Sequence, residues 1–173
     1  MKDKEMTAYF AVVTLFYMAA SFAHPVTPTL IVERELDSSM FGIALASICA
    51  HRWGKPMVFA KKAKSDNIEG GLYQSDIFSY TYKKKVTLLV SKEWLSADDR
   101  VLIVDDFMAN GEAMRGLCDI VANAGATLVG VGCAVEKGFQ GGGDRLRAAG
   151  VNLKSLAIIE SAEPGNIVFR DDD

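Results

Sequence analysis

The chain alternates short apolar runs with longer stretches in which apolar residues recur at helical spacing. Short strands are predicted at 29–32 and 56–60, and a helix at 43–52 that ends at a glycine. Residues 73–82 and 86–90 alternate apolar with polar side chains, which is typical of a small antiparallel excursion from a main sheet. Because strands separated by helices imply right-handed crossovers, we expect an α/β fold with a parallel sheet core flanked by helices.

The run 101–108, Val-Leu-Ile-Val-Asp-Asp-Phe-Met, is the most informative part of the chain. Four apolar, mostly β-branched residues followed by Asp105 and Asp106 predict a fully buried parallel strand that delivers two carboxylates to its C-terminal end. Ligands of open α/β sheets bind at that end. The run therefore predicts a binding site as well as a strand.

A tight turn and a helix are predicted directly after this strand. Ala109, Asn110 and Gly111 supply the turn, and the amphipathic stretch from Glu112 to a capping Gly125 supplies the helix. The turn then lies at a helix N-terminus, where free backbone N–H groups and the helix dipole can hold a phosphate. Carboxylates beside a phosphate suit a ligand such as a ribose 5-phosphate, because Asp accepts hydrogen bonds from sugar hydroxyls, and Mg²⁺ can share such a site.

The next predicted strand, 127–135, should end at the same sheet edge as Asp105. We therefore expect Lys137 to contact a ligand, although a lone lysine is more often a surface residue. Two other interpretations stay open: the Asp pair as a solvated strand end, and Phe139 as a core residue. A short helix and a last strand complete the predicted elements, at 144–149 and near 156–159.

Composition limits the classes of function. The chain has 173 residues, half of them hydrophobic, which suits one α/β core without a linker or internal repeat. A formal net charge of −3 argues against a nucleic-acid partner, because a duplex binder needs a basic stripe. The 3 cysteines lack metal-ligand spacing and lie in apolar or helical surroundings, so we expect buried thiols in a reducing compartment and no protein-bound metal.

The first part of the chain fits this picture least. Residues 8–23 are almost continuously apolar, yet they are short for a membrane span, which needs ~20 residues. We expect a buried helix and no membrane partner; a targeting segment is the alternative, because the stretch ends in the small-x-small pattern 21–23. The balanced charges of residues 1–6 argue against a signal peptide. The chain therefore divides into an atypical apolar segment, 1–28, and a domain, 29–173.

The segment Asp105-Asp-Phe-Met-Ala-Asn-Gly-Glu-Ala113 resembles the signature that binds 5-phosphoribosyl-1-diphosphate (PRPP) in the type I phosphoribosyltransferase family. Its Ala-Asn-Gly loop is most similar to that of the xanthine phosphoribosyltransferase branch, where it stands in for the commoner Thr-Gly-Gly-Thr. The resemblance covers residues 42–169, and four further segments carry it: 56–62, 73–83, 98–104 and 135–140.

The resemblance implies a purine salvage enzyme that transfers the phosphoribosyl group of PRPP, bound as its Mg²⁺ complex, to a 6-oxopurine, with xanthine favoured. It also implies a cytoplasmic homodimer whose partners are PRPP and a purine base. The implied catalytic residues, which hold the ribose, are Asp105 and Asp106. The implied PRPP-binding residues are Ala109, Asn110, Gly111, Glu112, Ala113, Lys61, Lys62, Ser79 and Tyr80, and the implied base-binding residues are Lys137 and Phe139.

Two stretches depart from the family pattern. Where members have a compact diphosphate loop of small residues, residues 35–44 carry bulky side chains; either Ser38, Ser39 and Gly42 rebuild the loop, or it is degraded. The polar hood segment that contacts the 2-oxo edge of xanthine has no match in residues 1–30. A non-catalytic PRPP-binding sensor, or a degraded paralogue with the same fold, is therefore the alternative function.

Overall fold

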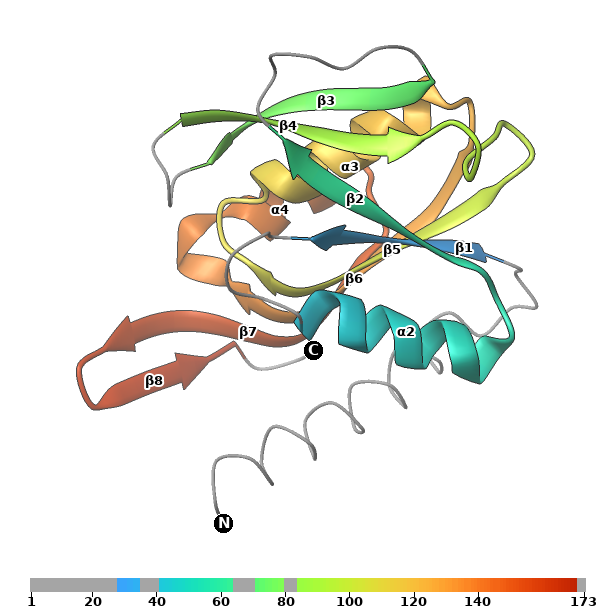
Figure 1. The fold of residues 1–173 in the computed structure, drawn as a ribbon. Helices are drawn as coiled ribbons and strands as arrows, with labels where there is room; N and C mark the ends of the chain where they lie inside the picture. Colours follow the sequence, from blue (N-terminus) through green and yellow to red (C-terminus); the bar gives the residue numbers. More distant parts are fainter. Residues whose placement is uncertain (1–27, 35–40, 64–70, 80–83, 171–173) are drawn as a thin grey trace.

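The computed structural model describes residues 28–34, 41–63, 71–79 and 84–170 (Figure 1). Within these ranges the chain forms strands, α-helices and one 3-10 helix in an alternating order. In chain order they are β1 (Pro28–Arg34), α2 (Phe41–Trp53), β2 (Met57–Ala63), β3 (Leu72–Ser79), β4 (Lys84–Ser91), β5 (Arg100–Met108), α3 (Glu112–Asn123), β6 (Thr127–Lys137), η1 (Gly138–Gln140), α4 (Gly142–Ala148), β7 (Leu153–Glu163) and β8 (Asn166–Phe169).

The strands form one sheet of 8 strands in the order β3-β4-β2-β1-β5-β6-β7-β8. The five central strands, β2-β1-β5-β6-β7, are parallel to one another. Strands β4 and β3 continue the sheet antiparallel on one side, and β8 closes the other side antiparallel to β7. The predicted α/β fold with a parallel core is confirmed, and the predicted antiparallel pair is present as β3 and β4.

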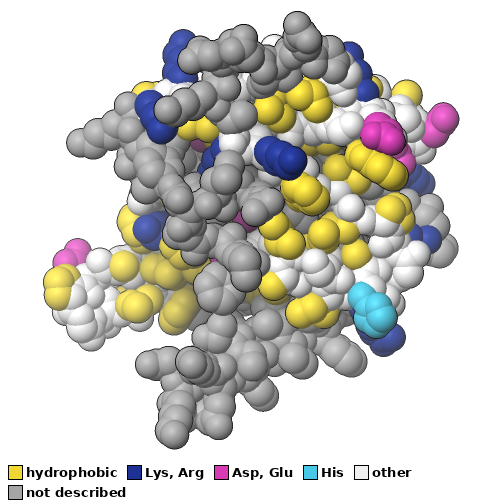
Figure 2. All heavy atoms as spheres, viewed as in Figure 1, with side chains coloured by type: hydrophobic (Ala, Val, Ile, Leu, Met, Phe, Trp, Pro, Cys, Tyr) yellow, Lys and Arg dark blue, Asp and Glu magenta, His cyan; other side chains and the backbone are white. Residues whose placement is uncertain are grey.

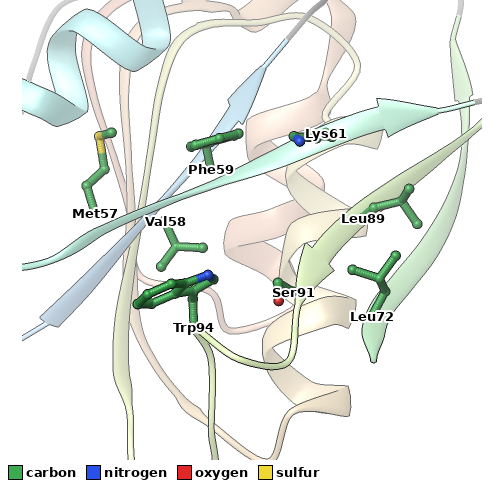
Figure 3. Close-up of a pocket in the computed structure, with 8 residues that line it drawn as sticks. All are labelled: Met57, Val58, Phe59, Lys61, Leu72, Leu89, Ser91 and Trp94. Atoms are coloured by element: carbon green, nitrogen blue, oxygen red, sulfur yellow. The ribbon is translucent and has the colours of Figure 1, made fainter. Parts of the chain in front are cut away.

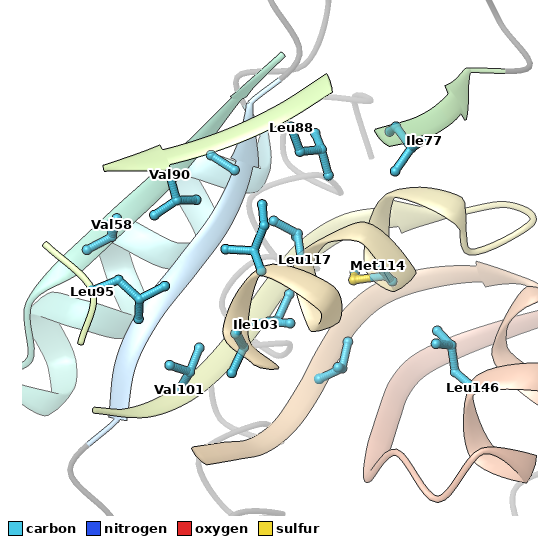
Figure 4. Close-up of a cluster of buried hydrophobic side chains, with 14 of the residues drawn as sticks. Val58, Ile77, Leu88, Val90, Leu95, Val101, Ile103, Met114, Leu117 and Leu146 are labelled. Carbon is cyan, nitrogen blue, oxygen red and sulfur yellow. The ribbon is translucent and has the colours of Figure 1, made fainter. Parts of the chain in front are cut away.

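Strand β5 is buried on both faces, as the sequence of the run 101–108 predicts. Val101 and Ile103 pack in a cluster with α3, whereas Leu102 and Val104 pack in a second cluster with α2. All four side chains are at most 1% exposed, and burying an aliphatic side chain of this size stabilises the fold by ~1.5 to 3 kcal/mol. Figure 4 shows the first cluster, in which β5 and α3 meet beneath β4.

Several element boundaries differ from the prediction. Strand β6 ends at Lys137, two residues later than predicted, because β7 continues to pair with it as far as Lys137↔Ile159. Lys61 and Lys62 lie inside β2 and not after it, since β4 pairs with both residues. The hairpin strand β8 was not predicted. Both predicted helix stops are confirmed: Gly54 and Gly125 follow α2 and α3 with φ of +61° and +72°.

The prediction of buried thiols can be compared with the structure, whereas the prediction for the apolar N-terminal segment cannot. No disulfide forms among the described residues; Cys49 and Cys133 are buried as predicted, and Cys118 is partly buried. Burial raises the thiol pKa of Cys49 and of Cys118 to about 11. The predicted helix within segment 1–28 lies outside the described residues. Of that segment the structure describes only Pro28, the first residue of β1. Among the described helices, none has the length and apolar character needed to cross a membrane.

Candidate active site

Asp105 and Asp106 lie within the last part of β5, which continues to Met108 because β6 pairs with it up to Met108↔Glu136. Asp105 is 7% exposed, and Asp106 is partly buried. The Asp105 carboxylate accepts a hydrogen bond from the backbone N–H of Asp106 at 3.0 Å. The two carboxylates are therefore presented at the carboxyl end of a central parallel strand, as predicted, with the backbone between them held by Asp105.

The loop after β5 has the geometry that the sequence predicts for a phosphate site. Gly111 has φ +77°, a left-handed conformation that favours glycine, and α3 begins at the next residue, Glu112. No side chain caps the start of α3, so the first-turn N–H groups are not used by a capping residue. Glu112 forms an ion pair with Arg115 at 3.3 Å, and Ala113 packs against the core. Ala109 and Asn110 are partly buried.

Lys137 lies at the end of β6, beside the end of β5. Its ammonium lies 4.9 Å from the centre of the Phe107 ring, a cation–π contact. The register places Cys133 opposite Asp105 and Val135 opposite Phe107, so Lys137 lies beyond the carboxylates on the same sheet edge. The structure thus brings Lys137 to the edge that carries the Asp pair.

Phe107 and Glu136 have no role in the sequence-based prediction, yet both flank the predicted residues. Phe107 is 43% exposed although it lies in a mostly apolar strand. Its ring makes the cation–π contact with the Lys137 ammonium. Glu136 is fully buried and forms an ion pair with Arg147 at 2.7 Å. Sequence pattern alone does not separate an exposed strand-end phenylalanine from a core one, nor a buried glutamate from a surface one.

Phe139 lies in the 3-10 helix η1, directly after β6, and is 50% exposed. It is therefore not a core residue. Its contact with a base stays a prediction, since it stands at the same end of β6 as Lys137 but on a separate turn.

The residues predicted to meet the diphosphate lie on the other side of β1. Val32 of β1 aligns with both Phe59 of β2 and Val104 of β5, so Lys61 stands at the level of Asp106, two strands away. Two strand spacings correspond to roughly 10 Å between backbones. Lys61 is exposed, with its ammonium 5.7 Å from the Phe59 ring.

The predicted hood contacts are described only in part. Strand β3 ends at Ser79, and the side chain of Ser79 and the whole of Tyr80 lie outside the described residues. Strand β3 itself is fixed to α3, because Ser75 donates a hydrogen bond to Asp119 at 3.0 Å and Arg115 donates one to the Asp76 carbonyl at 3.0 Å.

The loop between β1 and α2 is shorter than the stretch 35–44 that the sequence suggests. Helix α2 begins at Phe41, so Gly42 is a buried residue of its first turn and only residues 35–40 connect β1 to α2. Those six residues lie outside the described part of the chain. Whether they rebuild a diphosphate loop therefore stays a prediction.

A groove of about 480 Å³ lies where β2 and β4 diverge beside Trp94 (Figure 3). It does not include the Asp pair and shares only Lys61 with the predicted site. Its lining is mostly apolar: Met57, Val58, Phe59, Lys61, Leu72, Leu89, Ser91 and Trp94. The groove is thus a neighbour of the candidate active site and not its centre.

Residues 39–150, more than half of the chain, match the family model described as phosphoribosyl transferase domain. The chain belongs to the phosphoribosyltransferase family. It is 49% identical over 142 residues to a xanthine phosphoribosyltransferase of Bifidobacterium longum (strain NCC 2705), a match that covers 80% of this chain and 74% of the relative. It is 51% identical over 143 residues to that of Lachnoclostridium phytofermentans, covering 82% of this chain and 74% of the relative.

Solved phosphoribosyltransferase structures share the fold. An adenine phosphoribosyltransferase from Rhodothermus marinus superposes with a TM-score of 0.71 at 19% identity, covering 85% of this chain and 78% of that one. The enzyme from Giardia lamblia, complexed with 9-deazaadenine, gives a TM-score of 0.72 at 22% identity, covering 88% and 80%. At this identity the likeness supports the fold alone, and it confirms the phosphoribosyltransferase fold predicted from the signature.

Proposed function

We propose that this chain is a purine salvage phosphoribosyltransferase that transfers the 5-phosphoribosyl group of PRPP to a 6-oxopurine, with xanthine favoured, and releases diphosphate. The observation that carries the proposal is the edge formed by β5 and β6, where Asp105 and Asp106, a glycine turn at a helix N-terminus, and Lys137 stand together. The relatives at 49% and 51% identity are named xanthine phosphoribosyltransferases, which supports the same activity here.

The Asp pair and the following turn suit the ribose 5-phosphate part of PRPP. Asp105 and Asp106 accept hydrogen bonds from the ribose hydroxyls, and the backbone of the turn from Ala109 to Ala113 donates to the 5-phosphate. The dipole at the start of α3 adds ~0.3 to 1 kcal/mol, and each charge-assisted hydrogen bond ~1.5 to 3 kcal/mol.

The proposed preference for 6-oxopurines over adenine rests on Lys137. An ammonium group only donates hydrogen bonds, so it pairs with the 6-oxo group of xanthine, hypoxanthine or guanine and not with the amino group of adenine. The Phe107 ring contacts this ammonium, and Phe139 follows in η1 directly after Lys137. We propose that Phe139 packs against the base.

The reaction needs placement rather than a protein nucleophile. A nitrogen of the base forms a bond to C1 of the ribose while the C1–O bond breaks and its electron pair leaves with diphosphate. The proton of the imidazole ring of the base is released to water or to the leaving diphosphate. Lys61, Lys62, Ser79 and Tyr80 would neutralise and cover the diphosphate, which also keeps water from capturing the ribosyl cation.

Mg²⁺ fits this site as part of the substrate. The described residues contain no group of three or more acidic, histidine or cysteine side chains that could hold a metal ion by themselves. Mg²⁺ commonly keeps several waters and binds one or two carboxylates together with substrate phosphates. Asp105 and Asp106 provide such carboxylates, and the bound ion would supply charge that stabilises the leaving diphosphate.

We also propose that the protein works as a homodimer in the cytoplasm, where PRPP is made. Apolar side chains gather on one face, over β2 and between β4 and α2 (Figure 2). Phe59 and Trp94, which line one groove, are 38% and 63% exposed. Apolar patches of this kind mark interaction surfaces, and a second copy of the chain is the partner that we propose.

The direct test incubates the purified protein with PRPP, Mg²⁺ and each of xanthine, guanine, hypoxanthine and adenine, and measures nucleotide and diphosphate. We expect nucleotide from xanthine and little or none from adenine. A protein that binds PRPP yet forms no nucleotide with any base would be a PRPP-binding sensor or a degraded paralogue, the alternative that the relatives do not favour.

A further inference from the structure

Helix α4 packs unusually closely against the turn that follows β5. A Cβ atom on Gly142 would lie 2.5 Å from the Ala109 carbonyl oxygen and 2.6 Å from the Gly111 nitrogen, distances that real Cβ atoms do not show. In the other direction, a Cβ on Gly111 would lie 3.2 Å from the Gly142 Cα. The two backbones therefore touch, and only glycine at position 142 permits this contact.

A side chain of α4 also holds the same turn. Arg145 donates a hydrogen bond from Nη2 to the Asn110 carbonyl oxygen at 2.8 Å. This carbonyl belongs to the middle residue of the turn, so the bond fixes the orientation of the peptide between Asn110 and Gly111. Peptide orientation decides whether an N–H group points towards a bound phosphate.

Other residues of α4 hold the end of β6. Arg147 donates two hydrogen bonds to the fully buried carboxylate of Glu136, at 2.7 and 3.0 Å, and Ser155 of β7 donates a third at 2.5 Å. Gly143 packs onto the same carboxylate, where a Cβ atom would overlap it. Glu136 immediately precedes Lys137, so these contacts fix the strand end that carries the proposed base-binding lysine.

We propose that α4 positions both halves of the substrate site at once, with Gly142 and Arg145 setting the phosphate turn and Arg147 setting Lys137 through Glu136. This inference rests on the proposed function, because it assigns roles relative to PRPP and the base. Neither arginine needs to touch a substrate: each acts through the group that it holds. The two arginines reach different groups, the Asn110 carbonyl and the Glu136 carboxylate, so we expect their loss to affect different substrates.

The test compares Arg145→Ala with Arg147→Ala, using calorimetry for PRPP affinity and steady-state kinetics for each substrate. Arg145→Ala should weaken PRPP binding about threefold to tenfold, as expected for one lost hydrogen bond, with the KM for xanthine nearly unchanged. Arg147→Ala should instead raise the KM for xanthine about tenfold and change PRPP affinity less than about twofold. Arg145→Lys, which keeps a donor, should restore part of the PRPP affinity.

Two further variants keep the test decisive if Arg147→Ala does not fold. Glu136→Gln keeps the volume of the buried side chain, and it should raise the KM for xanthine selectively. Arg100→Ala, at the opposite end of β5, is the matched control and should change neither constant. If both arginine variants lower stability alike and leave both constants unchanged, or if both constants shift together, α4 is only structural and the inference is overturned while the proposed activity stands. A wild-type protein that binds no PRPP would overturn both.

Discussion

The two sides of the candidate site are built differently. The fixed side comprises β5, β6, the turn at 109–111 and α4, and two of its carboxylates are buried: Asp105 is 7% exposed and Glu136 is 0% exposed. The open side comprises β2 and β4 with their exposed face, where Phe59 is 38% exposed and Lys61 extends across it. Close backbone contact holds the first side, and solvated side chains line the second.

This difference matches what each part of the proposed reaction requires. The ribose phosphate and the base must be held in a fixed relation, because small displacements of reacting atoms are costly in rate. The diphosphate must enter and leave, and neutralising its charge tolerates looser geometry than aligning two reacting atoms. The comparison therefore predicts large, geometry-dependent effects on the fixed side and small, salt-dependent effects on the open side.

The largest effect is expected for Gly111→Val. The left-handed φ of +77° disfavours a β-branched residue at this position. A Cβ atom there would also lie only 3.2 Å from the Gly142 Cα. We expect PRPP binding to fall below detection by calorimetry, with most of the circular dichroism signal retained. Gly165→Val is the matched control, because Gly165 also has a positive φ, +80°, but open space around it. Normal PRPP binding to Gly111→Val would remove this turn from the site.

The next largest effect is expected for Asp105→Asn and Asp106→Asn. Each replaces a charged acceptor that would face sugar hydroxyls or Mg²⁺ in the proposed complex, a loss of ~1.5 to 3 kcal/mol, or roughly tenfold to a hundredfold in PRPP affinity. Asp105→Asn should be the more damaging, because Asp105 is the more buried of the two and the charge-assisted bond that it accepts from the Asp106 N–H becomes a neutral one. Asp98→Asn, on the exposed turn before β5, is the control. Unchanged affinity in both variants would contradict the assignment of the signature.

The fixed side also shows what the sequence can predict. Asp105 and Asp106 lie on a strand and Gly111 in the turn that follows it, so local sequence patterns are enough to predict their places in the fold. The contacts of α4 with this turn were not predictable, because Gly142 and Asn110 are brought together only by the tertiary fold. Phe107 was missed for a related reason, since an apolar residue in an apolar strand has no pattern that marks it as exposed.

A smaller effect, specific to the base, is expected for Lys137→Ala. Removing the only proposed donor to the 6-oxo group should lower kcat/KM for xanthine, hypoxanthine and guanine about tenfold to a hundredfold, as for a charged hydrogen bond. PRPP affinity measured by calorimetry should stay within about twofold, because the proposed contact of Lys137 is with the base and not with PRPP. If the wild type prefers adenine, or if Lys137→Ala uses oxopurines normally, the specificity argument is wrong even though the family assignment stands.

The smallest effect is expected on the open side, for Lys61→Ala. An exposed charge pair is worth ~0.2 to 1 kcal/mol, so PRPP affinity should fall about fivefold at most, and the effect should shrink as salt screens the charge. Binding of ribose 5-phosphate, which lacks the diphosphate, should not change. Lys154→Ala, an exposed lysine on β7, is the matched control. A salt-independent loss of a hundredfold would show that Lys61 is held as tightly as the Asp pair, and the contrast between the two sides would then disappear, because rigid placement would extend across the whole sheet edge.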